Sequence, residues 1–244
     1  MGTHLDLRHN GSVIRYDPDG AAPFEPRVFD SGWLKQTDHH RGNAAGRGAA
    51  HFLHFGGRDM VLRPYLRGGL ARKISRDLFL YTGFEHTRSM REFALTNWMH
   101  AQGLPVPRAV AAQVTQVGPL YRAAIVTERI PDAQPMEDHL RAGPINADLW
   151  HRVGKTVRRM HDAGVYHSDL NRRNILIDGN ADVWLIDFDK CDRRAPGSWT
   201  QDNLSRLHRS LAKDDQQGPM HWTPDDWHAL QAGYQGQAPR PLRG

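Results

Sequence analysis

Cysteine is almost absent from this chain of 244 residues. Because Cys191 is the only one, no disulfide can form within the chain, and a metal cluster held by several thiolates is excluded. This cysteine usage fits a reducing compartment. A chain of this length can bury a large hydrophobic core and is long enough to form two small lobes.

Long apolar runs are missing as well. No stretch of 18 apolar residues occurs, which excludes a helix that spans a membrane. Residues 1–6 do not open the apolar segment of a signal peptide, and Asp6 stands where a myristoylation signal needs Ser or Thr. We therefore expect neither a leader nor a membrane span, while peripheral attachment to a membrane stays open.

Acidic residues are fewer than basic ones, 27 against 32, which gives a net charge of +5. Such a surplus favours an anionic partner, which could be nucleic acid, an anionic membrane or a phosphorylated substrate. No interleaving of aromatic and basic residues typical of nucleic-acid binding is visible, so we expect no nucleic-acid partner.

The stretch most informative about function runs from His167 to Asp189. Two short apolar segments within it flank Asp178-Gly179-Asn180, a pattern that predicts a β-hairpin. Asp169 and Asn174 precede the first strand and Asp187 follows the second. A hairpin would therefore bring one amide and two carboxylates to the same end.

These three side chains suit phosphoryl transfer. One carboxylate can accept a hydroxyl proton, while the amide and the other carboxylate are hard oxygen ligands for Mg²⁺. The spacing H-x-D-x-x-x-x-N followed by D-F-x resembles the catalytic and metal-binding loops of protein-kinase-like phosphotransferases. An ordinary polar loop is the alternative, and the full spacing between two strands argues against it.

We therefore interpret the chain as a kinase that uses ATP and Mg²⁺. Asp169 is predicted to orient or deprotonate the acceptor hydroxyl, and Asn174 and Asp187 to hold the metal ion. Arg172 or Arg173 would stabilise the charge on the transferring phosphoryl group, with a solvated surface position as the alternative for both.

The first half of the chain offers candidate nucleotide contacts. Gly46 and Gly48 lie in a glycine-rich run that could let backbone amides close over phosphates, although its spacing departs from G-x-G-x-x-G. Arg63, on a strand predicted over 59–66, occupies the place of the phosphate-gripping lysine. Glu92, on a helix predicted from Thr87 to Met99, is its expected partner. A surface arginine and a solvated glutamate are the alternatives.

The predicted fold class is α+β, a bilobal protein-kinase-like fold. Two strands at about 108–116 and 120–128 lead into a connector, where the backbones of Glu128 and Ile130 are expected to bind adenine. The predicted parts are an N-terminal extension over 1–41 with a strand or two, an N-lobe over 42–131 with an antiparallel sheet and one helix, and a mainly helical C-lobe over 132–244. The C-lobe helices are predicted over 146–163, over 200–213 and from Thr223 onward.

Two departures from the protein-kinase pattern favour a small or non-protein acceptor. Ser168 replaces the arginine that binds activating phosphates, and Asp189 replaces the last glycine of D-F-G. Basic runs at 63–76 and 190–194 predict an anionic acceptor, with a solvated face as the alternative. The candidate acceptor residues are Arg67, Arg72, Lys73, Arg76, Lys190, Arg193 and Arg194.

With these residues placed, the chain resembles the bacterial 3-deoxy-D-manno-octulosonic acid (Kdo) kinases of the lipopolysaccharide kinase superfamily. The resemblance covers roughly residues 42–213, and its most specific stretch is Leu-Arg-x-Tyr-x-Arg-Gly-Gly-Leu at 62–70. It implies transfer of the γ-phosphate of ATP to the 4-hydroxyl of Kdo on a lipid A precursor. It also implies a peripheral position on the cytoplasmic face of the bacterial inner membrane, where both the acceptor and the membrane surface are anionic.

Three other functions stay open from the sequence. A heptose kinase of the same superfamily would share every catalytic residue. A small-molecule phosphotransferase of the aminoglycoside-kinase type would line its acceptor site with carboxylates rather than arginines. A basic pseudokinase or binding module would not need the complete set of Asp169, Asn174 and Asp187. The oligomeric state is not predicted.

Overall fold

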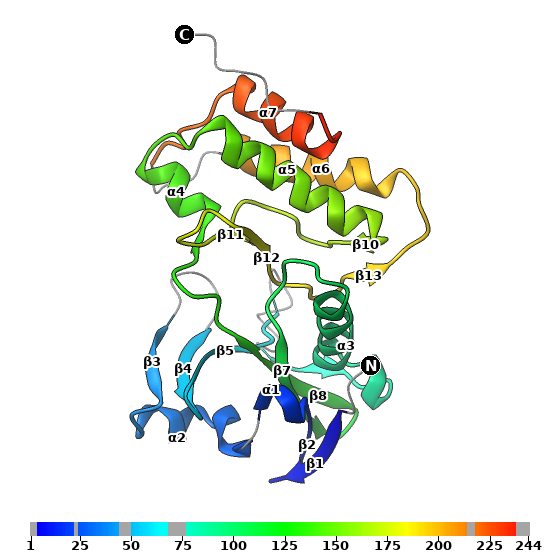
Figure 1. Cartoon of the computed structure of the whole chain (residues 1–244). Helices are drawn as coiled ribbons and strands as arrows, with labels where there is room; N and C mark the ends of the chain where they lie inside the picture. The colour runs from blue at the N-terminus through cyan, green and yellow to red at the C-terminus, as the bar shows by residue number, and fades with distance from the viewer. Residues whose placement is uncertain (1–3, 22–23, 44–49, 68–76, 214–217, 238–244) are drawn as a thin grey trace. The chain divides into compact units, whose positions relative to one another are not determined.

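The structure is a computed structural model, and it describes residues 4–21, 24–43, 50–67, 77–213 and 218–237 (Figure 1). The chain divides into two compact units. Unit 1 comprises residues 1–101 and 107–129, and unit 2 comprises residues 102–106 and 130–244. The chain passes from unit 1 to unit 2 at Arg129 and Ile130, next to the boundary predicted at residue 131.

Unit 1 is built on an antiparallel sheet of eight strands. Their order is β1-β2-β7-β8-β5-β4-β3, and β6 pairs with β8 beside this path. The strands are β1 (Leu5–His9), β2 (Ser12–Tyr16), β3 (His40–Asn43), β4 (His51–Phe55), β5 (Arg58–Pro64), β6 (Phe79–Leu80), β7 (Ala109–Val117) and β8 (Leu120–Glu128). The helices are α1 (Pro18–Ala21), η1 (Pro26–Phe29), α2 (Ser31–Lys35), η3 (Phe84–His86) and α3 (Arg88–Ala101).

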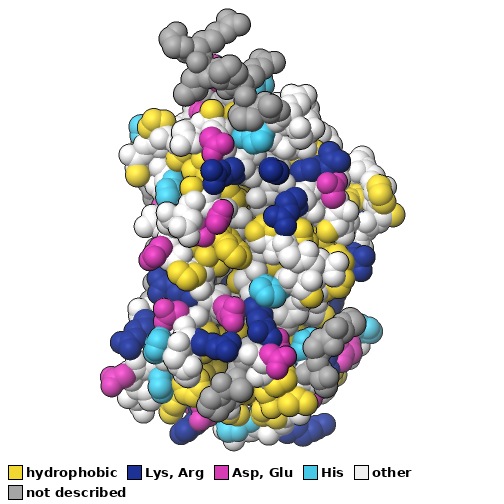
Figure 2. Space-filling model, in the orientation of Figure 1, with side chains coloured by type: hydrophobic (Ala, Val, Ile, Leu, Met, Phe, Trp, Pro, Cys, Tyr) yellow, Lys and Arg dark blue, Asp and Glu magenta, His cyan; other side chains and the backbone are white. Residues whose placement is uncertain are grey.

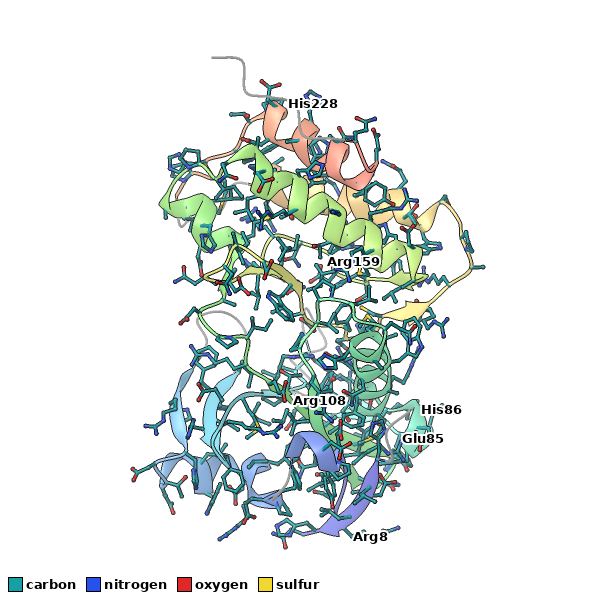
Figure 3. The ribbon with its side chains drawn as sticks, viewed as in Figure 1. Arg8, Glu85, His86, Arg108, Arg159 and His228 are labelled. Carbon is teal, nitrogen blue, oxygen red and sulfur yellow. The ribbon has the colours of Figure 1, made fainter. Side chains whose placement is uncertain are left out.

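Residues 5–16, within the predicted N-terminal extension, contribute two strands to this sheet, so they do not form a separate part. Strands β1 and β2 form a hairpin around Asn10 and Gly11, which both have positive φ (46° and 75°). Asn-Gly is the dipeptide that such tight hairpin turns favour, and this signal could have revealed the hairpin in the sequence. Strand β2 pairs with β7 over five residues, and Ile14 is completely buried. Arg108 ties the end of β2 to β7 through its Nε, which donates to Asp17 Oδ2 at 2.8 Å (Figure 3).

The sheet has a hydrophobic core on each face. Ala124 and Val126 of β8 pack in one cluster with Val28 and Leu34. The alternate residues of β8 pack in a second cluster with Met90 and Phe93 of α3. Because successive side chains of a strand point to opposite faces, η1 and α2 cover one face of the sheet and α3 covers the other.

Unit 2 is mainly helical. Its helices are α4 (Met136–Ala142), α5 (Ala147–Asp162), α6 (Trp199–Ala212) and α7 (Pro224–Tyr234), and its short strands are β9 (Gln134–Pro135), β10 (Val165–Tyr166), β11 (Ile175–Ile177), β12 (Val183–Leu185) and β13 (Asp192–Arg193). Strands β11 and β12 pair antiparallel, which confirms the predicted hairpin. Asn146 caps α5, Thr223 caps α7, and Arg159 of α5 donates to the Gly103 carbonyl at 2.7 Å (Figure 3).

The predicted fold class is confirmed: an antiparallel sheet with one long helix is followed by a mainly helical unit. The predicted long elements occur with bounds shifted by a residue or two. No helix in the described ranges combines the length and the apolar character needed to cross a bilayer.

Two glycines bring α5 and α7 into direct backbone contact. A Cβ atom on Gly154 of α5 would lie 1.9 Å from the carbonyl oxygen of Leu230, and one on Gly233 of α7 would lie 2.0 Å from that of His151. Neither helix backbone can accept such an approach, so only glycine permits this packing.

We expect Gly154→Ala to lower the free energy of unfolding by about 3 kcal/mol, because the two helices must move apart. On an exposed helix the same exchange would raise it by about 1 kcal/mol. Urea denaturation measures the free energy of unfolding of the wild-type chain and of the variant. Gly143→Ala is the control, because a Cβ there meets nothing within 4 Å. Equal stability of the two variants would contradict the close contact.

Candidate active site

A buried imidazole holds the loop between β10 and β11 in place. The amide of Asp169 donates to Nδ1 of His167 at 3.2 Å, so the ring proton is on Nε2, which donates to the Ile186 carbonyl at 3.1 Å. The ring is completely buried, and burial lowers the pKa of His167, which keeps the imidazole neutral. One neutral side chain therefore links the loop of Asp169 to the residue before Asp187.

A second buried side chain fixes the backbone of His167. The Oδ1 atom of Asn203, on α6, accepts from the His167 amide at 3.1 Å, and its Nδ2 donates to the His167 carbonyl at 2.9 Å. His161 Nε2 lies 3.3 Å from the same Oδ1, and Tyr234 Oη lies 2.8 Å from His161 Nδ1. The sequence analysis missed Asn203. The pattern that could have revealed Asn203 in the sequence is a polar residue next to Leu204, on the apolar face of α6.

The backbones that carry Asp169, Asn174 and Asp187 lie together, as the hairpin predicts. The side-chain amide of Asn174 donates to the Asp169 carbonyl at 2.9 Å, and the Ile186 amide donates to the Asn174 carbonyl at 3.1 Å. Asp187 adopts a left-handed backbone conformation with φ of 65°, which is uncommon for a residue other than glycine. The Asp169 side chain is 64% exposed, so a hydroxyl group can reach it.

The donor set fits a magnesium ion that also binds nucleotide phosphates. Because Nδ2 of Asn174 is engaged with Asp169, its amide oxygen remains available as a ligand. The Asp187 carboxylate supplies a second hard oxygen. Within the described ranges no three His, Cys, Asp or Glu side chains are grouped to hold a metal. Nucleotide phosphates and water would supply the other ligands, as is usual for Mg²⁺.

Arg172 and Arg173 contact α4, which differs from their predicted role beside the transferring phosphoryl group. Arg172 is buried, and its Nε donates to Glu137 Oε1 at 3.0 Å; Nη2 of Arg173 donates to the same oxygen at 3.1 Å. Burial alone would raise the pKa of Glu137, but the hydrogen bonds from Arg173 and Arg172 outweigh it and lower that pKa. These arginines anchor the loop. The Asp169 carboxylate instead pairs with Arg206, whose Nη1 lies 3.7 Å from Oδ1.

Unit 1 contains the expected pair of Arg63 and Glu92. Nη2 of Arg63 lies 2.5 Å from Oε1 of Glu92, and the Tyr65 hydroxyl donates to the other carboxylate oxygen. The Glu92 side chain is only 4% exposed, whereas that of Arg63 is 26% exposed. The guanidinium also stacks on the Tyr65 ring, 4.9 Å from its centroid. Tyr65, which the sequence analysis gave no role, therefore positions both members of the pair.

The remaining predicted contacts are spread over both units. Glu128 ends β8, and its amide donates to the Arg108 carbonyl at 2.9 Å, while Ile130 is the first buried residue after the passage into unit 2. Arg67 stacks on Phe79. Gly46, Gly48, Arg72, Lys73 and Arg76 lie outside the described residues.

The second predicted basic run follows Asp189. Lys190 has a left-handed backbone with φ of 58°, and Arg193 lies on β13. Arg194 stacks 3.4 Å from the centroid of the Tyr166 ring, and its Nε pairs with Asp192 Oδ1 at 2.8 Å. At least one charge of this run therefore has an internal partner.

The fold and these side chains define a class of protein. A sheet unit with a buried carboxylate–guanidinium pair, followed by a helical unit with Asp, Asn and Asp around a hairpin, is the arrangement of protein-kinase-like phosphotransferases. The model of the lipopolysaccharide kinase (Kdo/WaaP) family matches residues 31–234, and this chain belongs to that family. Membership confirms the predicted enzyme class, an ATP-dependent kinase with an alcohol group as acceptor.

Curated relatives cover nearly the whole chain. A protein named 3-deoxy-D-manno-octulosonic acid kinase from Photobacterium profundum is 40% identical over 94% of this chain and 98% of its own length. Proteins of the same name from Vibrio parahaemolyticus and Vibrio cholerae are 37% and 43% identical, over 91% and 75% of this chain and 94% and 77% of their own lengths. The resemblance found in the sequence is thereby confirmed.

We expect Asn203→Ala to lower the free energy of unfolding by about 2–4 kcal/mol, because the buried amide and carbonyl of His167 both lose their partner. The value of kcat should fall as well, because the loop that carries Asp169 is no longer fixed. Denaturation and kinetics at a temperature where both proteins are folded measure the two effects. Asn180→Ala, at the exposed hairpin turn, is the control, and a variant at 203 that matches it in both measurements would contradict the positioning role.

A pH dependence of stability follows from His161. Burial lowers its pKa to about 4, whereas an unfolded histidine titrates near 6.5. Between these values the unfolded chain binds a proton that the folded chain does not. The free energy of unfolding should therefore fall as the pH is lowered from about 6.5 toward 4.

Urea denaturation at several pH values tests this dependence. His161→Gln should flatten the slope, whereas His228→Gln, at an exposed position, should keep it. The pKa of His167 is also lowered by burial, so His167 contributes with the same sign in every variant. Identical slopes for the wild-type chain and His161→Gln would contradict the assignment.

Proposed function

We propose that this enzyme transfers the γ-phosphate of ATP to the 4-hydroxyl of Kdo on a lipid A precursor, in the assembly of the lipopolysaccharide core. The observation that carries the proposal is the hairpin with Asp169, Asn174 and Asp187 at one end, in a chain that belongs to the Kdo/WaaP family. The printed name of several full-length relatives, 3-deoxy-D-manno-octulosonic acid kinase, supports this acceptor.

Asp169 is the proposed base. Its exposed carboxylate accepts the hydroxyl proton as the acceptor oxygen attacks the γ-phosphorus, and the bond to the β-phosphate oxygen breaks to release ADP. His167 and Asn203 keep the Asp169 loop in position through the bonds described above. The Nη1 atom of Arg206 lies 3.7 Å from Oδ1 of the Asp169 carboxylate.

Asn174 and Asp187 are the proposed ligands of Mg²⁺ on the nucleotide. When bound, this ion neutralises charge on the ATP phosphates and aligns them with the acceptor. The chain contributes the two oxygens and holds them on adjacent backbone segments, because the Ile186 amide is bonded to the Asn174 carbonyl. Such prior fixing reduces the entropy that would be lost in arranging the ligands at each turnover.

Arg63 is the proposed grip on the nucleotide phosphates. The planar guanidinium matches the geometry of a phosphate, and its 26% exposed side chain agrees with this use. Gly46 and Gly48, and the backbones of Glu128 and Ile130, remain the proposed contacts for the phosphates and adenine.

The proposed acceptor is anionic, and the proposed site of action is the cytoplasmic face of the inner membrane. A lipid A precursor carries phosphates, and Kdo carries a carboxylate. Arg67, Arg72, Lys73, Arg76, Lys190, Arg193 and Arg194 are the candidate partners for these groups, and the net charge of +5 favours an anionic surface.

The direct test is incubation of the purified enzyme with ATP, Mg²⁺ and Kdo-lipid IVA, followed by mass spectrometry of the lipid. We expect the gain of one phosphate on Kdo. Phosphorylation of a heptosylated core with no reaction on Kdo-lipid IVA would replace the proposed acceptor with heptose. Preferential phosphorylation of an aminoglycoside would reject a lipid substrate.

We expect Asp169→Asn to lower kcat by about 10²–10⁴-fold, because the amide can no longer accept the hydroxyl proton. The affinity for ATP and the thermal midpoint should stay close to wild type, because the carboxylate is exposed. Asp182→Asn, an exposed position in the hairpin turn, is the matched control. Undiminished turnover by Asp169→Asn would reject the assignment of the base.

A further inference from the structure

Two of the three large apolar side chains that are exposed in the described structure lie on the two strands that pair with Leu120 of β8. Leu80 of β6 is 66% exposed, and Val117, at the end of β7, is 41% exposed. Both pair with the same residue of the strand between them: Leu80 lies opposite Leu120, and Val117 lies opposite Leu120. Since directly paired residues point to the same side of a sheet, these three side chains form one apolar row across β6, β8 and β7.

A polar row lies beside the apolar row on the same face. It runs from Arg122 of β8 through Thr115 and Ser12 to His9 of β1, and each of these residues is paired with the next. Arg122 is half exposed, with its Nε 2.7 Å from Asp77 Oδ2. Over a step of two residues along β8, this face of the sheet therefore changes from the aliphatic row to the row that contains Arg122 and His9.

This edge of the sheet is rigid. The Tyr81 amide donates to the Pro119 carbonyl at 3.0 Å, which fastens the end of β6 to the turn between β7 and β8. The hydroxyl groups of Ser12 and Thr115 lie 2.7 Å apart. On the opposite face of the same strands, Phe79 and Tyr121 belong to the core beside α3. The exposed leucine and valine are thus preformed and lose little conformational freedom on binding.

We infer that the row of Leu80, Leu120 and Val117 inserts into the surface of a phospholipid bilayer, with Arg122 and His9 at the level of the headgroups. Aliphatic side chains next to a basic side chain match the gradient from acyl chains to anionic headgroups. Figure 2 shows basic and acidic side chains interspersed on the face that it views, so net charge alone does not define a docking surface there. The inference rests on the proposed function, because a lipid-linked acceptor requires an enzyme at the membrane.

The test is flotation of the enzyme with vesicles of phosphatidylethanolamine and phosphatidylglycerol that contain no acceptor lipid. We expect the wild-type chain to bind, and the double variant Leu80→Asn, Val117→Asn to partition about tenfold or more weakly. Leu5→Asn is the matched control, because Leu5 is 43% exposed and lies at the far end of β1 from His9. Replacing phosphatidylglycerol with phosphatidylcholine should weaken binding, and Arg122→Gln should reduce that difference.

Kinetics provide a second measurement. The double variant should keep the wild-type turnover on a soluble, deacylated acceptor and lose turnover on the same acceptor embedded in vesicles. Equal vesicle binding by the wild-type chain and the double variant, or no binding by either, would overturn the inference. A change from dimer to monomer in the double variant, with vesicle binding retained, would instead identify the row as a contact between two copies of the chain.

The two proposals fail in different ways. Because the vesicles in the flotation test contain no acceptor, binding that depends on Leu80 and Val117 would stand even if the enzyme did not phosphorylate Kdo. Phosphorylation of Kdo with membrane binding unaffected by these residues would leave the proposed function intact and reject this docking surface.

Discussion

The arrangement of the candidate active site depends on a completely buried, neutral imidazole. His167 accepts a hydrogen bond from the Asp169 amide and donates one to the Ile186 carbonyl, so a single ring sets the distance between the loop of the proposed base and the loop of the proposed metal ligand. A protonated ring could not accept from the amide. The low pKa that burial imposes is therefore a condition for the geometry and not only a consequence of it.

Around this ring the molecule uses two kinds of buried polar contact. Asn203 satisfies the backbone amide and carbonyl of His167, and His161 contacts the Asn203 side chain in turn. Removing one partner leaves a buried group unsatisfied. Charged contacts from Arg172 and Arg173 meet the Glu137 carboxylate of α4. A buried ion pair adds less stability than its attraction suggests, because both charges must be desolvated, but breaking it leaves one charge without a partner. Both kinds of contact favour a single loop conformation.

Unit 1 also contains a buried polar contact, and this one orients a single side chain, Arg63. Glu92 is buried and is held by Arg63 and by the Tyr65 hydroxyl, while the arginine keeps part of its surface exposed. A buried carboxylate held in this way fixes the orientation of the guanidinium. The proposed role of Arg63 as a phosphate grip is chemically reasonable for an arginine in the place of the lysine of the kinase pattern, because a planar guanidinium matches both carboxylate and phosphate geometry.

Periodicity and turn signals in the sequence determined the long elements, the hairpin of β11 and β12 and the grouping of Asp169, Asn174 and Asp187, because these depend on contacts between residues close in the chain. The pair of Arg63 and Glu92 could also be predicted, through the order of a known motif. The tertiary structure alone decided that residues 5–16 complete the sheet, that Arg172 and Arg173 contact Glu137, and that Asn203 holds the backbone of His167. Each of these contacts joins residues far apart in the sequence. A local pattern can mark a side chain such as Asn203 as buried, but its partner across such a distance is fixed by packing.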